Sequence, residues 1–309
     1  MIRGLELARE FYFQHGRDML ESKFPAYRSR IACGLAGEGS DCLGYDDLVS
    51  QDHDFGPGFC MWLTDEDEEK IGAALRAAYM ELPDSFMGYR TRDPRSYGEQ
   101  RLSAMRISSF YLRFTGLAQA PATLEQWRRI PESFLSAATS GAVFVDESGE
   151  FSKIREALLA FYPEDVRLKK IAARAAVMAQ AGQYNYGRCL RRGEEVAAHA
   201  ALAEFIKAAC SMVYLLNRKY MPFYKWAHHG LKDMTVAPEV FALLSELCKS
   251  STSPERKTAL IESICIVVVK ALGAQNLTDI DDAFLAAQAP EIVKRIRDDT
   301  LRRMHVMAE

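Results

Sequence analysis

Residues 34–59 read GLAGEGSDCLGYDDLVSQDHDFGPGF, and this stretch decides the fold of the first half of the chain. The apolar run at residues 31–35 predicts a strand that leads into a glycine-rich turn. A turn that opens a helix offers unpaired backbone N–H groups to an anion, and glycine lets the anion approach closely. We therefore expect Gly37, Gly39 and Ser40 to form a phosphate-binding turn.

Two aspartates follow this turn. Eleven residues separate Ser40 from Asp52, and Asp54 comes two positions later. If this run is a strand, the two carboxylates point to one face and His53 points to the other. Two carboxylates one strand repeat apart repel each other unless a cation lies between them, and their oxygens suit Mg²⁺ or Mn²⁺. The spacing therefore predicts a metal site beside a phosphate site, which together bind a nucleotide.

The arrangement resembles the nucleotidyltransferase superfamily that includes DNA polymerase β and the aminoglycoside and lincosamide nucleotidyltransferases. The motif of that superfamily is Gly-Ser or Gly-Gly, then a spacer, then Asp-x-Asp or Asp-x-Glu on a strand. Here Gly39-Ser40 match the first part, and Asp52 and Asp54 match the second. The longer string resembles one uncharacterised branch, in which a helical half of unknown function follows the nucleotidyltransferase-like half. The resemblance extends over most of the chain, including LNRKY at residues 216–220.

The resemblance implies a metal-dependent transfer of a nucleoside monophosphate from a nucleoside triphosphate, with ATP the expected donor. Asp52 and Asp54 would hold Mg²⁺ or Mn²⁺, and Gly37, Gly39 and Ser40 would hold the phosphates. Pyrophosphate would leave, and the acceptor would be a hydroxyl of a small molecule or of a protein. The sequence does not choose between these acceptors.

A third carboxylate departs from the superfamily pattern. Many members carry it on a strand in the region of residues 102–114, which here contain no Asp or Glu. Glu99 is the nearest acid and is our candidate for the general base. Asp146 is more distant, and we interpret it as a turn residue that caps the following helix. Asp46 and Asp47 are likewise interpreted as turn or cap residues.

The missing acid keeps a second hypothesis open. The chain would then be a catalytically weak nucleotide-binding or partner-binding module that retains the fold. The arginines between residues 87 and 101 leave two interpretations equally open, because they either face a triphosphate or belong to a solvated loop. They are Arg90, Arg92, Arg95 and Arg101.

Composition narrows the class of protein. The 309 residues include 49% hydrophobic residues, which is enough for two domains with real cores. A net charge of −3 disfavours a nucleic-acid partner, because phosphate contacts need a basic surplus. Seven cysteines without a Cys-x-x-Cys pair indicate reduced thiols in a cytoplasmic protein. The longest apolar run, residues 264–269, is too short to cross a bilayer, so no membrane is expected.

The predicted fold class is α+β. A small mixed-sheet nucleotidyltransferase-like domain at residues 1–150 precedes an all-helical, substrate-binding bundle at residues 151–309. We expect strands at residues 31–35, within 103–114 and at 141–146, and a loop or irregular hairpin at 87–100. We expect helices at residues 4–20, 65–80, 153–161, 164–181, 194–217, 238–248, 254–272 and 278–304, the last of them broken at Pro290.

Two aromatic and basic patches in the helical half are candidates for the substrate-binding surface. Each by itself is more typical of a helix end, but either suits base stacking or acceptor binding if it faces a nucleotide. The residues are Tyr184 and Arg188 in the first patch, and Asn217, Tyr220, Lys225 and Trp226 in the second. The oligomeric state stays open.

Overall fold

The computed structural model describes residues 2–51, 55–95 and 102–309. They form a mixed α and β structure, with a small mixed sheet followed by helices, which confirms the predicted fold class. The chain divides into two compact units, Met1–Pro121 with Phe134–Ala160, and Ala122–Ser133 with Phe161–Glu309.

This division differs from the single boundary that we expected between residues 150 and 151. The first unit extends to Ala160 because Phe151 is fully buried in its core, and its ring stacks 3.9 Å from that of Trp62. Residues 122–133 belong to the second unit.

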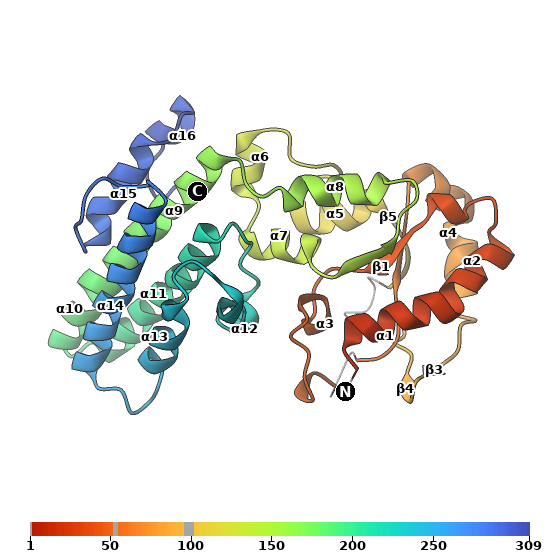
Figure 1. Cartoon of the computed structure of the whole chain (residues 1–309), viewed down its shortest axis with the longest axis horizontal. Helices are drawn as coiled ribbons and strands as arrows, with labels where there is room; N and C mark the ends of the chain where they lie inside the picture. The colour runs from red at the N-terminus through yellow and green to blue at the C-terminus, as the bar shows by residue number, and fades with distance from the viewer. Residues whose placement is uncertain (1, 52–54, 96–101) are drawn as a thin grey trace. The chain divides into compact units, whose positions relative to one another are not determined.

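The first unit is built on a four-stranded sheet with the order β5-β2-β1-β6 (Figure 1). The strands are β1 (Ala32–Leu35), β2 (Cys60–Leu63), β5 (Ser103–Arg106) and β6 (Ala142–Val145). β1 is antiparallel to both β2 and β6, whereas β2 and β5 are parallel. A separate hairpin joins β3 (Ser85–Phe86) to β4 (Tyr89–Arg90).

Helices cover both faces of this sheet, so the central strands β1 and β2 are buried at every position. Met61 and Leu63 pack in a cluster with residues of α1, α2 and α4. Trp62, which lies between them in the strand, points to the opposite face and contacts Phe110 of α5 and Phe151 of α8. This alternation follows from the two-residue repeat of a strand.

The helices of the first unit are α1 (Gly4–Phe11), α2 (Arg17–Lys23), α3 (Ser40–Leu43), α4 (Asp65–Tyr79), α5 (Ile107–Thr115) and α8 (Glu150–Leu159). Of these, α1, α4 and α8 begin at or close to the predicted residues, whereas the starts of α2 and α5 were not predicted. One π-helical segment, η1 (Tyr12–Gly16), joins α1 to α2, and short 3₁₀ helices lie at Arg28–Arg30 and Val49–Gln51.

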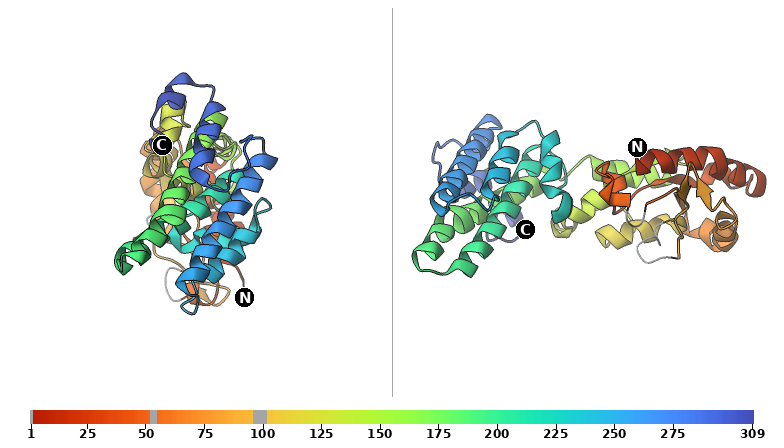
Figure 2. Two further views of the ribbon diagram at one scale, coloured as in Figure 1. Left: turned by 90° about the vertical axis from the view of Figure 1, so that its left-hand side faces the viewer. Right: turned by 90° about the horizontal axis from the view of Figure 1, so that it is seen from below.

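The second unit is helical, and its long helices α9, α11 and α14 lie side by side (Figure 2). Its elements are α6 (Leu124–Arg129), α9 (Glu164–Met178), η4 (Ala179–Tyr186), α10 (Gly187–Arg191), α11 (Glu195–Leu216), α12 (Tyr224–Ala227), η5 (His229–Asp233), α13 (Glu239–Leu247), α14 (Pro254–Ala274), α15 (Leu285–Lys294) and α16 (Asp299–Arg303). A further helix, α7 (Glu132–Thr139), begins in this unit. Among the described helices, α11 alone has the length and hydropathy of a membrane-spanning segment. It packs against α9, η4 and α14, as the core helix of a bundle does.

Two features of the helical part differ from expectation. Pro290 lies inside α15, and the predicted break comes later, at residues 295–298. The break is stable because Asp165 accepts hydrogen bonds from the backbone N–H groups of Arg297 and Asp298, at 3.0 and 2.8 Å. The helices α6 and α7 were not expected, although Thr123 and Gln126 form a capping box that is visible in the sequence.

Candidate functional site

The glycine-rich turn follows the carboxyl end of β1 and accepts a hydrogen bond from Ser140. Gly37 and Gly39 have φ angles of 115° and 134°, which residues with a side chain rarely adopt. The Oγ atom of Ser140 donates a hydrogen bond of 2.6 Å to the carbonyl oxygen of Gly37. Gly39 and Ser40 are partly exposed, whereas Gly37 is buried, so the part of the turn that is open to a ligand is the part formed by Gly39 and Ser40. The helix that starts at Ser40 has only four residues, so an anion here would depend on the amides of the turn itself.

Asp52, Asp54 and Glu99 lie outside the described residues. The segments on either side of the aspartate pair are described. Gly34 in β1 pairs with Cys60 in β2, and the two strands are antiparallel. The end of β1 and the start of β2 therefore share one edge of the sheet, and the glycine turn arises from that edge.

Gly4, the first residue of α1, packs closely against residues on both sides of the aspartate pair, Asp41 before it and Phe55 after it. A Cβ atom on Gly4 would lie 2.8 Å from the Cβ of Asp41 in α3 and 3.4 Å from a ring carbon of Phe55. The backbone N–H of Gly4 donates a 2.7 Å hydrogen bond to Oδ2 of Asp46, which is buried. Asp46 thus caps α1, and Asp47 accepts a 3.0 Å bond from the backbone N–H of Ser50. The interpretation of both acids as cap or turn residues is confirmed.

A buried ion pair ties α3 to the segment that follows β4. Nη1 of Arg92 lies 3.0 Å from Oδ2 of Asp41, with the two side chains 3% and 9% exposed. The backbone N–H of Arg92 also donates a 3.1 Å hydrogen bond to the carbonyl oxygen of Pro57. Arg92 was expected either to face a triphosphate or to belong to a solvated loop. Neither interpretation included an ion pair with Asp41, because the sequence does not show that the two residues meet. The neighbouring Arg95 is exposed and pairs with Asp93.

Asp146, the more distant candidate acid, has structural partners. Oδ1 and Oδ2 of Asp146 accept hydrogen bonds of 2.9 and 2.8 Å from the backbone N–H groups of Gly149 and Ser152 at the start of α8. The capping role of Asp146 is confirmed. Across residues 2–51, 55–95 and 102–309, no three His, Cys, Asp or Glu side chains lie close enough to hold a metal ion. A metal at this site would therefore depend on Asp52 and Asp54.

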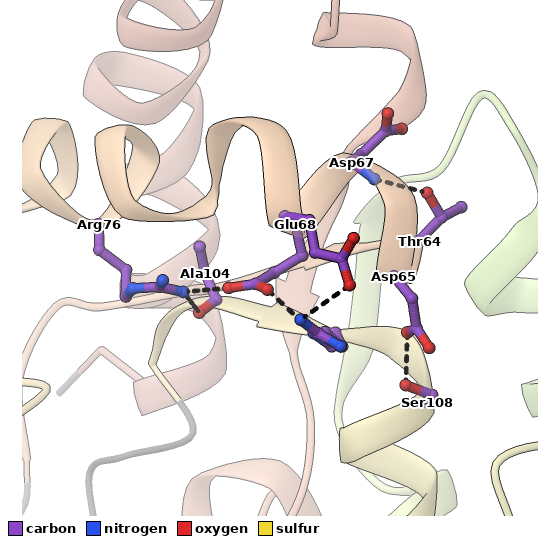
Figure 3. A network of polar contacts seen from close by, with 9 residues as sticks. Thr64, Asp65, Asp67, Glu68, Arg76, Ala104 and Ser108 are labelled. Carbon is purple, nitrogen blue, oxygen red and sulfur yellow. Dashed lines mark hydrogen bonds and ion pairs between the residues drawn. The ribbon is translucent and has the colours of Figure 1, made fainter.

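A network of acids lies at the opposite edge of the sheet, where β2 and β5 end (Figure 3). Glu68 accepts hydrogen bonds of 2.7 Å from Arg76 and 2.9 Å from Arg106, and the Arg76 bond is the main cause of its lowered pKa. Ser108 donates a 2.5 Å bond to Asp65. Because this edge is the far end of β2 from the glycine turn, these acids do not supply the third carboxylate.

The first substrate patch lies on η4 and α10 of the second unit. The guanidinium carbon of Arg188 lies 4.7 Å from the ring centre of Tyr184, and the side chain of Tyr184 is 51% exposed. This cation–π pair presents a flat aromatic and cationic surface, which would suit a base or an acidic group.

The second patch is largely occupied by contacts within its own unit. The amide nitrogen of Asn217 donates to the carbonyl oxygens of Val213 and Val236 at 2.8 and 2.9 Å. Its oxygen accepts from the backbone N–H groups of Thr235 and Val236 at 3.0 and 2.9 Å. Asn217 therefore fixes the chain after α11. The feature of the sequence that indicates this role is the position of Asn217 at the end of the clearest amphipathic helix.

The remaining residues of the second patch are aromatic or basic. Tyr220 packs with its ring centre 4.8 Å from that of Phe161 and 5.1 Å from that of Tyr162. The ammonium of Lys225 lies 5.4 Å from the ring centre of Trp226.

The structure does not bring the two patches together. Gly182, just before the first patch, packs against Phe205 of α11, and the second patch begins at Asn217. At about 1.5 Å per helical residue, Phe205 and Asn217 are about 18 Å apart along α11. The patches are therefore two separate surfaces of the helical unit.

Comparisons with known proteins give limited information. Residues 127–227 match the family model described as "Domain of unknown function (DUF4037)", which covers less than half of the chain. A nucleotidyltransferase-like protein from Exiguobacterium sibiricum 255-15 is similar in structure over 90% of each chain, with 12% sequence identity and a TM-score of 0.36. The comparison with curated proteins finds no match.

Proposed function

We propose that this protein is a metal-dependent nucleotidyltransferase. It would move a nucleoside monophosphate from ATP to a hydroxyl of a small molecule or protein, with release of pyrophosphate. The amides of the turn at Gly37, Gly39 and Ser40 would bind the phosphates. Asp52 and Asp54 would hold Mg²⁺ or Mn²⁺, which supplies positive charge against the phosphate oxygens.

One observation supports this proposal above the others. The open glycine turn and the start of β2 lie at the same edge of the sheet, and the aspartate pair falls between them in sequence. The Asp41–Arg92 pair and the contacts at Gly4 hold the flanking segments in place. A site that brings an acceptor hydroxyl to the α-phosphate of ATP needs such positioning, because misplacement of the reacting atoms slows the reaction steeply.

The test uses the purified protein with ATP labelled at the α-phosphate, Mg²⁺ and fractions of a cell extract. We expect label transfer with pyrophosphate release, and a fall of about 10²-fold or more in Asp52→Asn and Asp54→Asn. Asp281→Asn is a matched control, because Asp281 is an exposed aspartate of the second unit. Unchanged transfer in both Asp52→Asn and Asp54→Asn would refute the assignment.

A second candidate function follows from the acids that the structure does describe. Asp65, Glu68 and Asp146 all have structural partners, and residues 102–114 contain no acid. The protein would then bind Mg²⁺–ATP without transferring its nucleoside monophosphate to an acceptor. Calorimetric ATP titration separates the cases: binding that depends on Mg²⁺ and Asp52, with no label on any fraction, favours this module. Absence of ATP binding contradicts both functions.

A further inference from the structure

A buried cluster of charged and polar side chains lies in the second unit, away from the glycine turn in sequence. It comprises Glu132, Tyr162, Lys170, Arg174 and Ser211, called here the Arg174 cluster. Lys170 is 4% exposed and Tyr162 is 3% exposed. Charged groups are rarely buried to this degree without a full set of partners.

The carboxylate of Glu132 accepts hydrogen bonds from two other members of the cluster. Oε1 of Glu132 accepts a 3.2 Å hydrogen bond from Arg174 and a 2.8 Å bond from Ser211. Arg174 also donates a 2.7 Å bond from Nε to Ser211. Glu132 therefore balances the charge of Arg174 and leaves that of Lys170.

The two remaining donors of the cluster, Lys170 and Tyr162, lack well-placed acceptors among the described residues. The ammonium of Lys170 donates a long 3.3 Å bond to the carbonyl oxygen of Arg128 and lies 5.2 Å from the ring centre of Tyr162. The buried hydroxyl of Tyr162 has no hydrogen-bond partner among the described residues. Burial raises the pKa of Tyr162 well above its usual value, so this hydroxyl remains a donor at neutral pH. The cluster thus has surplus positive charge and unused donors.

Glu309 supplies the missing negative charge. Its Oε1 accepts a hydrogen bond from Nη1 of Arg174, while its Oε2 is buried without a hydrogen-bond partner among the described residues. The segment that carries this side chain is weakly held, since none of residues 305–309 is buried. Their other hydrogen bonds are local, from Met307 and Ala308 back to His305. A loosely held carboxylate therefore reaches a rigid site built on helices.

We propose that the Arg174 cluster is an anion-binding site for a ligand that bears a carboxylate or phosphate group, and that Glu309 fills it as a displaceable internal substitute. A guanidinium presents a planar fork that matches either group, and Tyr162 and Lys170 add donors. The cluster uses none of the residues assigned to the proposed nucleotide site, and the proposal does not rest on nucleotidyl transfer.

The test compares the full chain with Glu309→Ala and the milder Glu309→Gln. We expect each variant to melt roughly 2–4 °C below the original protein, because Arg174 loses one of its two carboxylate partners but keeps Glu132. Sodium acetate and sodium phosphate, titrated at constant ionic strength against sodium chloride, should restore the melting temperature with saturation. Their apparent affinity should be about 10-fold higher than for the unmodified protein, in which Glu309 competes. The anion with the larger effect identifies the chemical class.

The control variant is Glu246→Ala, which removes the acid of an exposed pair with Arg256 in the same unit. It should show no saturable response to either anion. Equal responses of all variants would reveal a general salt effect and overturn the proposal. Loss of stability in Glu309→Ala and Glu309→Gln without recovery by either anion would also overturn it, because Glu309 would then be a structural partner of Arg174 only. Adding Lys170→Met to Glu309→Gln should abolish the recovery, and its persistence would contradict the assigned site.

Discussion

The buried pair between Asp41 and Arg92 gives a direct test of how the glycine turn is held. Asp41→Asn keeps the size of the side chain and an acceptor for the 2.7 Å bond from the backbone N–H of Cys42. It removes the charge opposite Arg92, whose side chain is 3% exposed. Breaking one partner of a buried pair costs about 3–5 kcal/mol, because the remaining charge stays buried. At about 2–4 °C per kcal/mol, the melting temperature of the first unit should fall by about 6–20 °C.

The assay is denaturation followed by the fluorescence of Trp62, which is fully buried in the first unit. The double variant Asp41→Leu, Arg92→Met should recover most of the loss, since it removes both buried charges. The matched control is Glu66→Gln, which breaks an exposed pair with Lys70 and should leave stability nearly unchanged. If Asp41→Asn costs no more than this control, or if the double variant is as unstable as the single one, the pair does not hold the turn.

Three further outcomes are expected. Phe151→Ala should lower the free energy of unfolding by about 3–5 kcal/mol in urea titrations, because its ring is fully buried against Trp62, whereas the partly exposed Phe223→Ala should change it little. Iodoacetamide should label the exposed Cys248 in the native protein, while Cys33 reacts only after unfolding because burial raises its pKa. Burial also raises the pKa of Tyr162 above the usual 10.0. At a pH above 10.0 the native state therefore keeps the Tyr162 proton that the unfolded state has lost. Stability should therefore fall as pH rises above 10.0, and Tyr162→Phe should reduce that slope by up to about 1.4 kcal/mol per pH unit.

The proposed nucleotide site and the Arg174 cluster use different physical means to attract anions. The glycine turn offers backbone amides, which carry no charge that needs a partner when the ligand is absent. The Arg174 cluster uses formal charges at a buried position, where an absent ligand leaves an unfavourable excess. This difference explains why Glu309 fills the Arg174 cluster while the turn at Gly39 and Ser40 stays partly exposed.

Local sequence signals predicted much of the secondary structure. The apolar run before Gly34 became β1, and the capping residue Thr64 starts α4 by accepting a hydrogen bond from the backbone N–H of Asp67. Gly37 and Gly39 adopt the positive φ angles that a tight turn requires. These features depend on a few neighbouring residues, so a short window of sequence contains the necessary information.

Contacts between distant residues were decided only by the tertiary structure. Arg92 is 51 positions from Asp41, and Asp46 caps a helix that begins 42 positions earlier. No periodicity links such pairs, because each partner is chosen by how strands and helices pack. The sequence by itself therefore determined many of the strands and helices and the glycine turn, through local backbone preferences and the spacing of apolar residues, but it did not predict α6 and α7. Packing decided which acids became caps and ion-pair partners, because a buried charge takes the nearest group that satisfies it.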